Sequence, residues 1–147
     1  MPSASRSITI RRSPEDVFAF VADGTTATQW RPGVTDIKLA SGTGLGARYE
    51  QGVKGPGGRR VAADYEITAW DPPRSLAFGA TAGPVRPTGS YTLEAVPDGT
   101  RLTFALDAQV GGIKGLLMGK AVQGSMDAEM ASLDRLKSLL EASAPTA

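Results

Sequence analysis

The end of the chain carries a long amphipathic helix pattern, and it follows a series of short strand patterns. From about residue 112 to residue 141, apolar residues recur at helical spacing, and a wheel of about 100° per residue places them in one arc. The arc is rich in glycine in its first half and in leucine in its second. Its members are Gly115, Gly119, Val122, Met126, Met130, Leu133, Leu136 and Leu140, with Met118 at its edge.

The glycines of this helix pattern suggest empty space beside the helix. Gly119 and Gly124 each cost about 1 kcal/mol relative to alanine inside a helix, so their presence needs a reason. One reason is the close approach of a strand, and the other is cavity volume. A helix that begins near Leu116 would leave both glycines unexplained. We expect a hollow beside the glycines and solid core beside the leucines.

Between these glycines and the start of the chain, apolar and polar residues alternate as in half-buried strands. Leu102, Phe104 and Leu106, for example, share one face of an expected strand. The strands are joined by short turns, and such neighbours are antiparallel because a parallel pair needs a long crossover. With a first strand around Ile8 and Ile10, the pattern predicts about seven strands.

Two short helices are expected between the first strand and the others. Ser13 can cap a helix and Pro14 suits its first turn, while the two acidic residues that follow complement the helix dipole. A second short helix is expected from Thr25 to Gln29, and Pro32 ends it.

Composition excludes several classes of function. The 147 residues suit a single domain, spanning 1–147, with 142–147 as a disordered tail. Sixteen basic and fifteen acidic residues give a net charge of +1, which does not favour nucleic acid. The chain has no cysteine and no histidine, so we expect no metal and no cofactor. Without a signal-like or membrane-spanning apolar run, we expect a cytoplasmic protein with no stable membrane insertion, either a monomer or a homodimer.

The order of these elements resembles the START-like, Bet v 1-like helix-grip superfamily, and local motifs resemble its SRPBCC (polyketide cyclase/dehydrase) branch. The resemblance covers nearly the whole chain, although its motifs mark turns, caps and core positions. They are Ser13-Pro14-Glu15-Asp16-Val17-Phe18, Trp30-Arg31-Pro32, Tyr65-Glu66-Ile67-Thr68, Asp71-Pro72-Pro73-Arg74, Asp98-Gly99-Thr100-Arg101-Leu102 and Leu133-Asp134-Arg135-Leu136-Lys137.

This resemblance implies an α+β helix-grip fold. A curved, seven-stranded antiparallel sheet would wrap around the long C-terminal helix and enclose an apolar cavity. Members of the superfamily bind lipids, sterols, polyketides or other hydrophobic molecules, and some are enzymes. The fold does not choose among these functions.

Candidate ligand-binding residues follow from the faces of the expected strands and helix. Gln51 is unusual among them, because its amide either orients a ligand or reaches solvent at an edge. Trp30 fits a core position or a lid at the pocket mouth. The candidates are Trp30, Tyr49, Gln51, Tyr65, Phe78, Tyr91, Phe104, Met118, Gly119, Val122 and Met126.

Glu129 falls inside the apolar arc and is the best placed acid or base. The alternatives are an ion pair with an arginine at the rim, or a side chain that extends outward. Three functions remain open: a binder of a small hydrophobic molecule such as a lipid, polyketide or quinone; a polyketide cyclase or dehydratase that uses Glu129, Gln51 and a tyrosine; and an interaction domain with a vestigial cavity.

Overall fold

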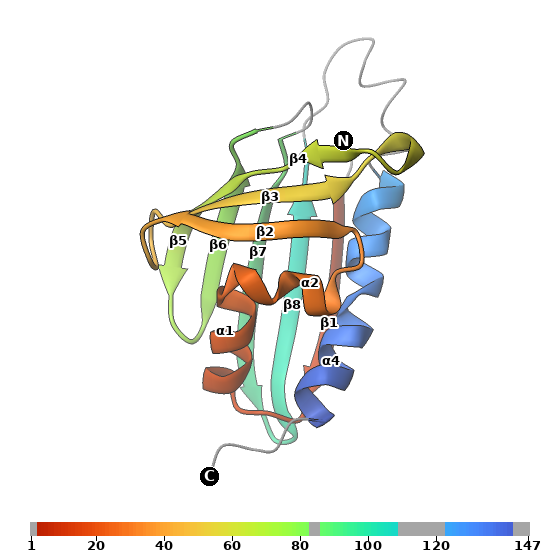
Figure 1. Cartoon of the computed structure of the whole chain (residues 1–147). Coiled ribbons are helices and arrows are strands. Elements are labelled where there is room, and N and C mark those ends of the chain that lie inside the picture. The colour runs from red at the N-terminus through yellow and green to blue at the C-terminus, as the bar shows by residue number, and fades with distance from the viewer. Residues whose placement is uncertain (1–2, 83–85, 109–122, 143–147) are drawn as a thin grey trace.

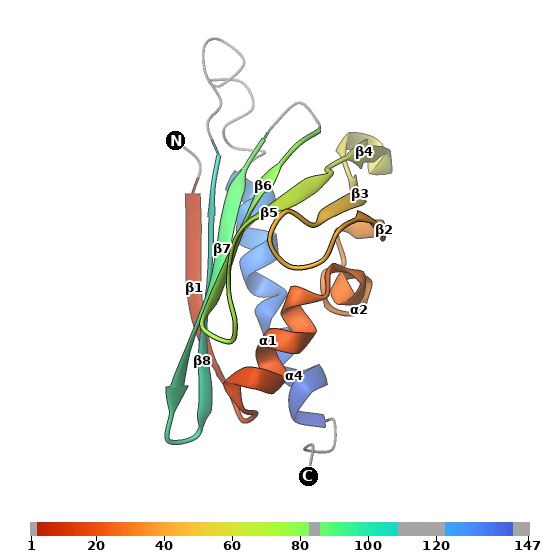
Figure 2. The same cartoon turned by 90° about the vertical axis from the view of Figure 1, so that its left-hand side faces the viewer.

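The protein folds as a curved antiparallel sheet that wraps around helices lying on its concave side (Figures 1 and 2). The computed structural model describes residues 3–82, 86–108 and 123–142. The strands are β1 (Ser3–Ile10), β2 (Val34–Ser41), β3 (Arg48–Lys54), β4 (Arg60–Ala62), β5 (Tyr65–Asp71), β6 (Ser75–Ala80), β7 (Thr88–Val96) and β8 (Gly99–Asp107). The helices are α1 (Pro14–Ala22), α2 (Ala27–Trp30) and α4 (Leu133–Ala142), and the 3-10 turns are η1 (Gly24–Thr26) and η2 (Pro56–Gly58).

Seven strands form the main path of the sheet, in the order β1-β8-β7-β6-β5-β3-β2. Every pair within the described residues is antiparallel, as the short turns predicted. The helix-grip fold is therefore confirmed. An additional short strand, β4, lies off this path and pairs with β3.

In the sequence, Val61, Ala63, Tyr65 and Ile67 alternate with other residues and predict one continuous strand after η2, but the structure differs from this prediction. The structure divides it into β4 and β5 at Ala63 and Asp64. Here the Gln51 N–H donates to Oδ1 of Asp64 at 3.0 Å, and the Ala63 N–H donates to the Gln51 carbonyl at 2.7 Å. A side-chain acceptor thus replaces a ladder partner, which ends one strand and begins the next.

The two short helices after β1 are confirmed. The Ser13 hydroxyl accepts a hydrogen bond from the Asp16 N–H at 3.2 Å, and Pro14 opens α1. The Asp23 side chain accepts from the Thr25 N–H at 3.0 Å and caps η1, which leads directly into α2. These caps fix the place at which α2 crosses the sheet, and so they position Trp30 at the end of α2.

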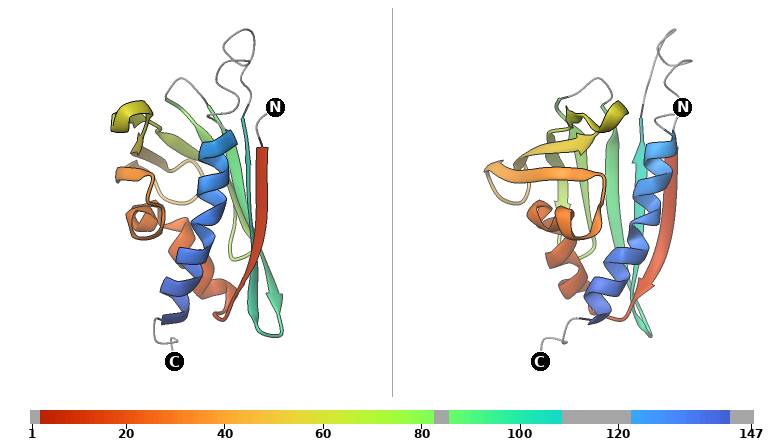
Figure 3. Two further views of the ribbon diagram at one scale, coloured as in Figure 1. Left: turned by 90° about the vertical axis from the view of Figure 1, so that its right-hand side faces the viewer. Right: turned by 45° about the vertical axis from the view of Figure 1, so that its right-hand side comes forward.

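Leucines of α4 fill the space between this helix and the sheet, as expected. α4 lies along β1 (Figure 3), and its side chains reach the inner face of β8. Leu133 and Leu136 are fully buried, as are Leu102 and Phe104. This end of the concave face is solid core.

The C-terminal helical pattern is less continuous than the sequence suggested. Residues 123–131 are helical, but Ser132 forms a turn before α4 begins. The Ser132 hydroxyl donates to the Glu129 carbonyl and competes with the regular backbone pattern there. Helical structure continues through Ala142, so the expected tail does not begin at that residue, while 143–147 lie outside the described residues.

The interpretation of the glycines was wrong where the structure tests it. Gly124 is exposed, and a Cβ built on it would meet nothing within 4 Å, so it marks neither a hollow nor a close strand. Gly115, Met118, Gly119 and Val122 lie outside the described residues. Of the helices within 3–82, 86–108 and 123–142, none is long and apolar enough to cross a membrane.

Candidate functional site

A cavity lies on the concave face, where α1, η1 and α2 meet the inner surfaces of β3, β5, β6 and β7. Its volume is about 40 Å³, which is room for about three water molecules. Most of its lining is aromatic or aliphatic, with a few polar groups among them. The described residues that line it are Val21, Ala22, Asp23, Gly24, Thr26, Ala27, Trp30, Arg31, Gln51, Tyr65, Ile67, Leu76, Phe78 and Tyr91.

Gly24 allows the turn between α1 and α2 to approach the tyrosines of the sheet. A Cβ built on Gly24 would overlap the Tyr65 hydroxyl and would lie 2.7 Å from the ring of Tyr49. The N–H of Gly24 donates to the Tyr49 hydroxyl at 3.3 Å. A larger residue at position 24 would therefore push α2 away from the sheet.

A row of aromatic rings crosses the inner face from β3 to β8. Tyr49 and Tyr65 stack with ring centroids 5.0 Å apart, and Phe78 follows Tyr65 at 5.5 Å. Tyr91 lies 6.1 Å from Phe78 and stacks on Phe104 at 4.6 Å. These distances are those of favourable aromatic pairs, so the row forms one connected wall.

An ion pair connects α2 to the C-terminal helical region. Arg31 donates from Nε to Oε2 of Glu129 at 2.7 Å and from Nη2 to Oε1 at 3.1 Å. The side chains are only 15% and 19% exposed. Burial by itself would lower the pKa of Arg31, but the charge and hydrogen bonds of Glu129 outweigh burial and raise it. The guanidinium thus stays charged inside the protein, and the ion-pair alternative for Glu129 is confirmed.

Gln51 belongs to the same polar cluster. It is 5% exposed, so the alternative that it reaches solvent is wrong. Its Oε1 accepts from Nη1 of Arg31 at 3.1 Å, and its Nε2 donates to the Ala63 carbonyl at 3.2 Å. Both ends of the amide therefore have protein partners, and Gln51 fixes the orientation of the Arg31 side chain.

Two tyrosines, Tyr65 and Tyr91, line the cavity together with Arg31. The hydroxyls of Tyr65 and Tyr91 make no hydrogen bond to another described residue. Burial raises the pKa of both tyrosines, and the positive charge of Arg31 offsets only part of that increase. Both hydroxyls are consequently protonated donors at neutral pH.

Trp30 is a buried member of the wall and does not form an exposed lid. It is 2% exposed, its ring lies 6.4 Å from that of Tyr91, and the Arg31 guanidinium carbon lies 6.0 Å from its ring centroid. Its indole N–H is buried and has no hydrogen-bond partner among the described residues. An unpaired buried donor costs about 1–3 kcal/mol, and Trp30 is one of the residues that line the cavity.

The cavity gathers about half of the residues expected from the sequence. Trp30, Gln51, Tyr65, Phe78 and Tyr91 line it. Tyr49, Phe104 and Met126 are buried but lie outside its lining, and Met118, Gly119 and Val122 lie outside the described residues. That any of these residues binds a ligand stays a prediction.

Arg31 is the main site residue that the sequence reasoning missed. It was seen only as part of the Trp30-Arg31-Pro32 motif. The available signal was the isolated carboxylate at Glu129, which required a cationic partner somewhere in the fold. Identifying that partner needed the three-dimensional contact, because the two residues are 98 positions apart.

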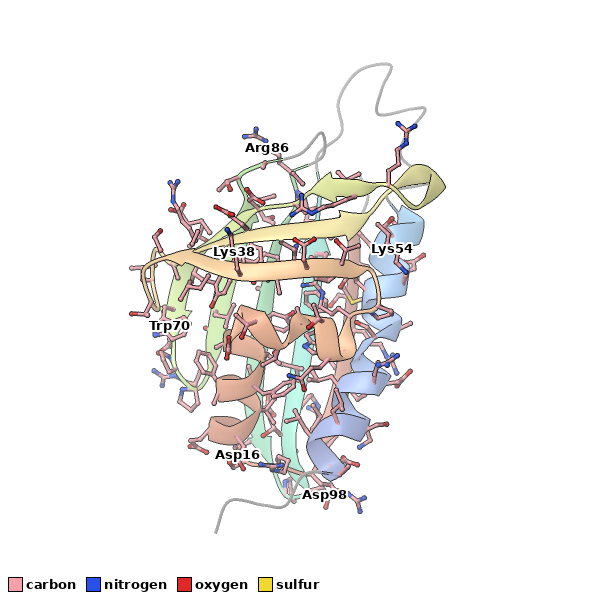
Figure 4. All side chains as sticks on the ribbon, in the orientation of Figure 1. Asp16, Lys38, Lys54, Trp70, Arg86 and Asp98 are labelled. Carbon is pink, nitrogen blue, oxygen red and sulfur yellow. The ribbon has the colours of Figure 1, made fainter. Side chains whose placement is uncertain are left out.

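Other ion pairs show how different the Arg31 environment is. Lys38, labelled in Figure 4, pairs with Glu50 across β2 and β3, and the side chains are 73% and 50% exposed. Arg60 pairs with Asp36 at 2.7 Å, also on the surface. Such exposed pairs contribute little to stability. The Arg31 pair instead lies at the wall of a cavity.

Sequence comparison identifies the family to which this fold belongs. A family profile described as polyketide cyclase / dehydrase and lipid transport matches residues 1–141. The chain belongs to this family. An uncharacterized protein of Mycobacterium tuberculosis is 28% identical over 104 residues, which are 68% of this chain and 61% of that protein. The chain thus matches about three fifths of the length of this relative.

Solved structures share the fold at low sequence identity. A protein from Thermus thermophilus superposes with a TM-score of 0.78 at 22% identity, covering 96% of this chain and 97% of that one. A START superfamily protein from Mycobacterium smegmatis gives 0.75 at 16% identity, with 95% and 97% covered. The di-domain ARO/CYC StfQ from the steffimycin biosynthetic pathway gives 0.77 at 11% identity, with 95% and 51% covered. At these identities the likeness establishes the fold alone.

Proposed function

We propose that the chain binds a small hydrophobic molecule in the cavity between α1, α2 and the sheet. The observation that carries the proposal is the cavity lining, in which aromatic walls surround polar groups that lack protein partners among the described residues. The Trp30 indole N–H is the clearest of these groups, because it is buried and unpaired there. Apolar walls with a few placed polar groups are typical of ligand sites.

The size of the cavity sets a condition on binding. About 40 Å³ holds water molecules but not a ring-sized ligand, so the aromatic wall must open when such a ligand enters. Tyr65 and Phe78 are only partly buried and lie on the wall, which makes them the side chains best placed to move. The energy needed for this movement reduces the affinity, and a ligand that fills the opened cavity compensates for it.

A ligand that binds only the folded state stabilises it, and that gives a direct test. Thermal unfolding in the presence of aromatic ketones, quinones, sterols and lipids should show a higher Tm with at least one of these classes. Ala27→Leu should abolish the increase, because Ala27 is buried and lines the cavity. Ala69→Leu is the matched control on an exposed position of β5, and it should retain the increase.

An absence of any Tm increase across these ligand classes would contradict the proposal and favour the interaction domain with a vestigial cavity. An increase that survives Ala27→Leu would also contradict it, because the ligand would then bind elsewhere.

A second candidate function is that of a cyclase or dehydratase, and one observation favours it. Tyr65 and Tyr91 line the same cavity as the charged Arg31, and hydroxyl and guanidinium donors stabilise an enolate oxygen. Glu129 is less suited to act as a base than the sequence suggested, because Arg31 engages both of its carboxylate oxygens. Loss of turnover with retained binding in Glu129→Gln would favour an enzyme, whereas a binder has no turnover to lose.

A further inference from the structure

We infer that the cavity selects ligands that present a neutral carbonyl oxygen, as in a ketone or quinone, and that Glu129 is the residue that excludes carboxylates. This inference rests on the proposed function, because it concerns the ligand of the same cavity. Two independent features support it: the hydrogen-bonding groups left without protein partners are mainly donors, and the charged residues described at the cavity leave no excess positive charge.

The first feature is the surplus of donors. Arg31 has five N–H groups, and three of them are used by Glu129 and Gln51. The Trp30 indole N–H is buried and unpaired among the described residues. No further hydrogen bond to a described residue involves the remaining two N–H groups of Arg31 or the hydroxyls of Tyr65 and Tyr91, which belong to residues that line the cavity. A ligand with an acceptor oxygen satisfies these groups, and a ligand that only donates leaves them unpaired.

The acceptors around the cavity are largely occupied by the protein. Gln51 Oε1 and both oxygens of Glu129 accept from Arg31. Asp23, which also lines the cavity, accepts through Oδ1 from the N–H and the hydroxyl of Thr25. The acceptor left for a ligand amine among these described groups is Oδ2 of Asp23, whose side chain is exposed to solvent, so an amine gains less there than an acceptor oxygen gains from the donors.

The second feature is charge. Among the described residues that line the cavity, Arg31 is the cation, and Glu129 neutralises it through two hydrogen bonds. Asp23 adds a negative charge to the lining. A carboxylate that entered would lose its hydration and gain no unpaired cation, and an unpaired buried anion is strongly unfavourable. A ketone oxygen accepts the same hydrogen bonds without that cost.

The role of Glu129 follows from these two features. Its carboxylate pairs with Arg31 and lies outside the cavity lining, so it acts on a ligand through the guanidinium. With Glu129 present, Arg31 is a donor of hydrogen bonds with its charge already paired. Without the carboxylate, Arg31 would be an unpaired cation that attracts anions. Glu129 is thus a positioning residue that sets charge selectivity.

Isothermal titration calorimetry of the full chain at pH 7 tests the inference with ligands of matched shape: acetophenone, benzoate and 1-phenylethylamine, and the larger pair 2-acetylnaphthalene and 2-naphthoate. We expect the ketones to bind at least about tenfold more tightly than the acids and the amine. In Glu129→Gln, the affinity for the acids should rise by about tenfold or more, because Arg31 is then unpaired.

Two variants control for other effects. Glu94→Gln makes the same change in a surface pair with Arg101 and should leave the preference unchanged. The double variant Arg31→Gln, Glu129→Gln restores a neutral cluster, so it should reject acids again. Acids that bind the natural sequence as tightly as ketones, or a Glu129→Gln protein that still rejects acids, would overturn the inference and leave the proposed function standing. Failure of every ligand to bind would instead contradict the proposed function.

Discussion

The two ends of the concave face are built from the same sheet but have different chemistry. Where α4 packs on β1 and β8, leucines and Phe104 fill the space completely. Where residues of α1, η1 and α2 face those of β3, β5, β6 and β7, the interior holds a cavity, and the Arg31–Glu129 pair lies beside it. The first end resembles an ordinary core. The second end contains a buried ion pair and an unpaired donor, which reduce the free energy of unfolding unless a ligand forms hydrogen bonds with them.

Under the proposed function, stability and binding depend on different halves of one fold: the half filled by leucines and the half that holds the cavity. Alternation along the strands places apolar side chains inward in both halves. In the half that holds the cavity, the sheet is covered by the short elements α1, η1 and α2 and not by one long helix. The polar side chain of Arg31, at the end of α2, lines the cavity there. Substitutions at the two ends should therefore change different measured quantities, and the following predictions are ordered by expected size.

The largest effect is expected in the solid half. Leu136→Ala should reduce the free energy of unfolding by about 2–5 kcal/mol, because Leu136 is 0% exposed and its truncation leaves a cavity. Chemical denaturation monitored by circular dichroism measures this change. Leu45→Ala is the control, since Leu45 is 65% exposed and its truncation should cost less than about 0.5 kcal/mol. A small effect at Leu136 would show that the core is not solid.

The second largest change in stability is expected at the Arg31–Glu129 pair, in the half that holds the cavity. Glu129→Gln should reduce the free energy of unfolding by about 2–3 kcal/mol, because it leaves the guanidinium of Arg31 without its counter-charge in a mostly buried place. The double variant Arg31→Gln, Glu129→Gln should recover much of that loss. A double-mutant cycle measures the coupling, and additive effects of the two single changes would contradict a direct interaction.

Most of the fold was predictable from the sequence because its signals are local. The Ser13 cap, the alternation through Phe104 and the leucines of α4 each depend on residues close together in the chain. The site was only partly predictable. Arg31 meets Glu129 across 98 positions, and Asp64 replaces a strand partner of Gln51, so neither contact leaves a periodic signal. The prediction of a hollow beside Gly124 was wrong because helical spacing does not show whether a glycine faces the sheet or the solvent.

Tyr91, which lines the cavity, should make the free energy of unfolding depend on pH in the alkaline range. Burial raises the pKa of Tyr91 in the folded state above its value of about 10 in the unfolded chain. The free energy of unfolding is therefore unaffected by this group below pH 10, and it falls as pH rises above 10 because the unfolded chain loses the proton first. Tyr65 behaves in the same way. Above pH 10, Tyr91→Phe should reduce the loss of stability by about 1.4 kcal/mol per pH unit. Denaturation midpoints from pH 8 to 11 measure it, and an unchanged alkaline slope would contradict the burial of the hydroxyl.

The smallest effect belongs to the outer surface. A hydrogen bond from Arg60 is the main cause that lowers the pKa of Asp36 to about 2. A lowered pKa means that the contribution of this pair is present above pH 4 and is lost as pH falls towards 2. Asp36→Asn should slightly flatten the acid side of the stability profile, and added salt should weaken the difference. A large change in the acid side of the profile would show that exposed ion pairs contribute as much to stability as the buried residues do.

The indole N–H of Trp30 tests the central claim most directly, because it reports hydrogen bonding inside the cavity. The chain has two tryptophans, and Trp70→Phe identifies the Trp30 signal in a ¹H–¹⁵N spectrum. Saturation with 2-acetylnaphthalene should move the Trp30 indole proton downfield, since a ketone oxygen accepts its hydrogen bond, while the signal of Trp70, which lies at the surface (Figure 4), should stay in place. Ligand binding that leaves the Trp30 signal unmoved would contradict the account.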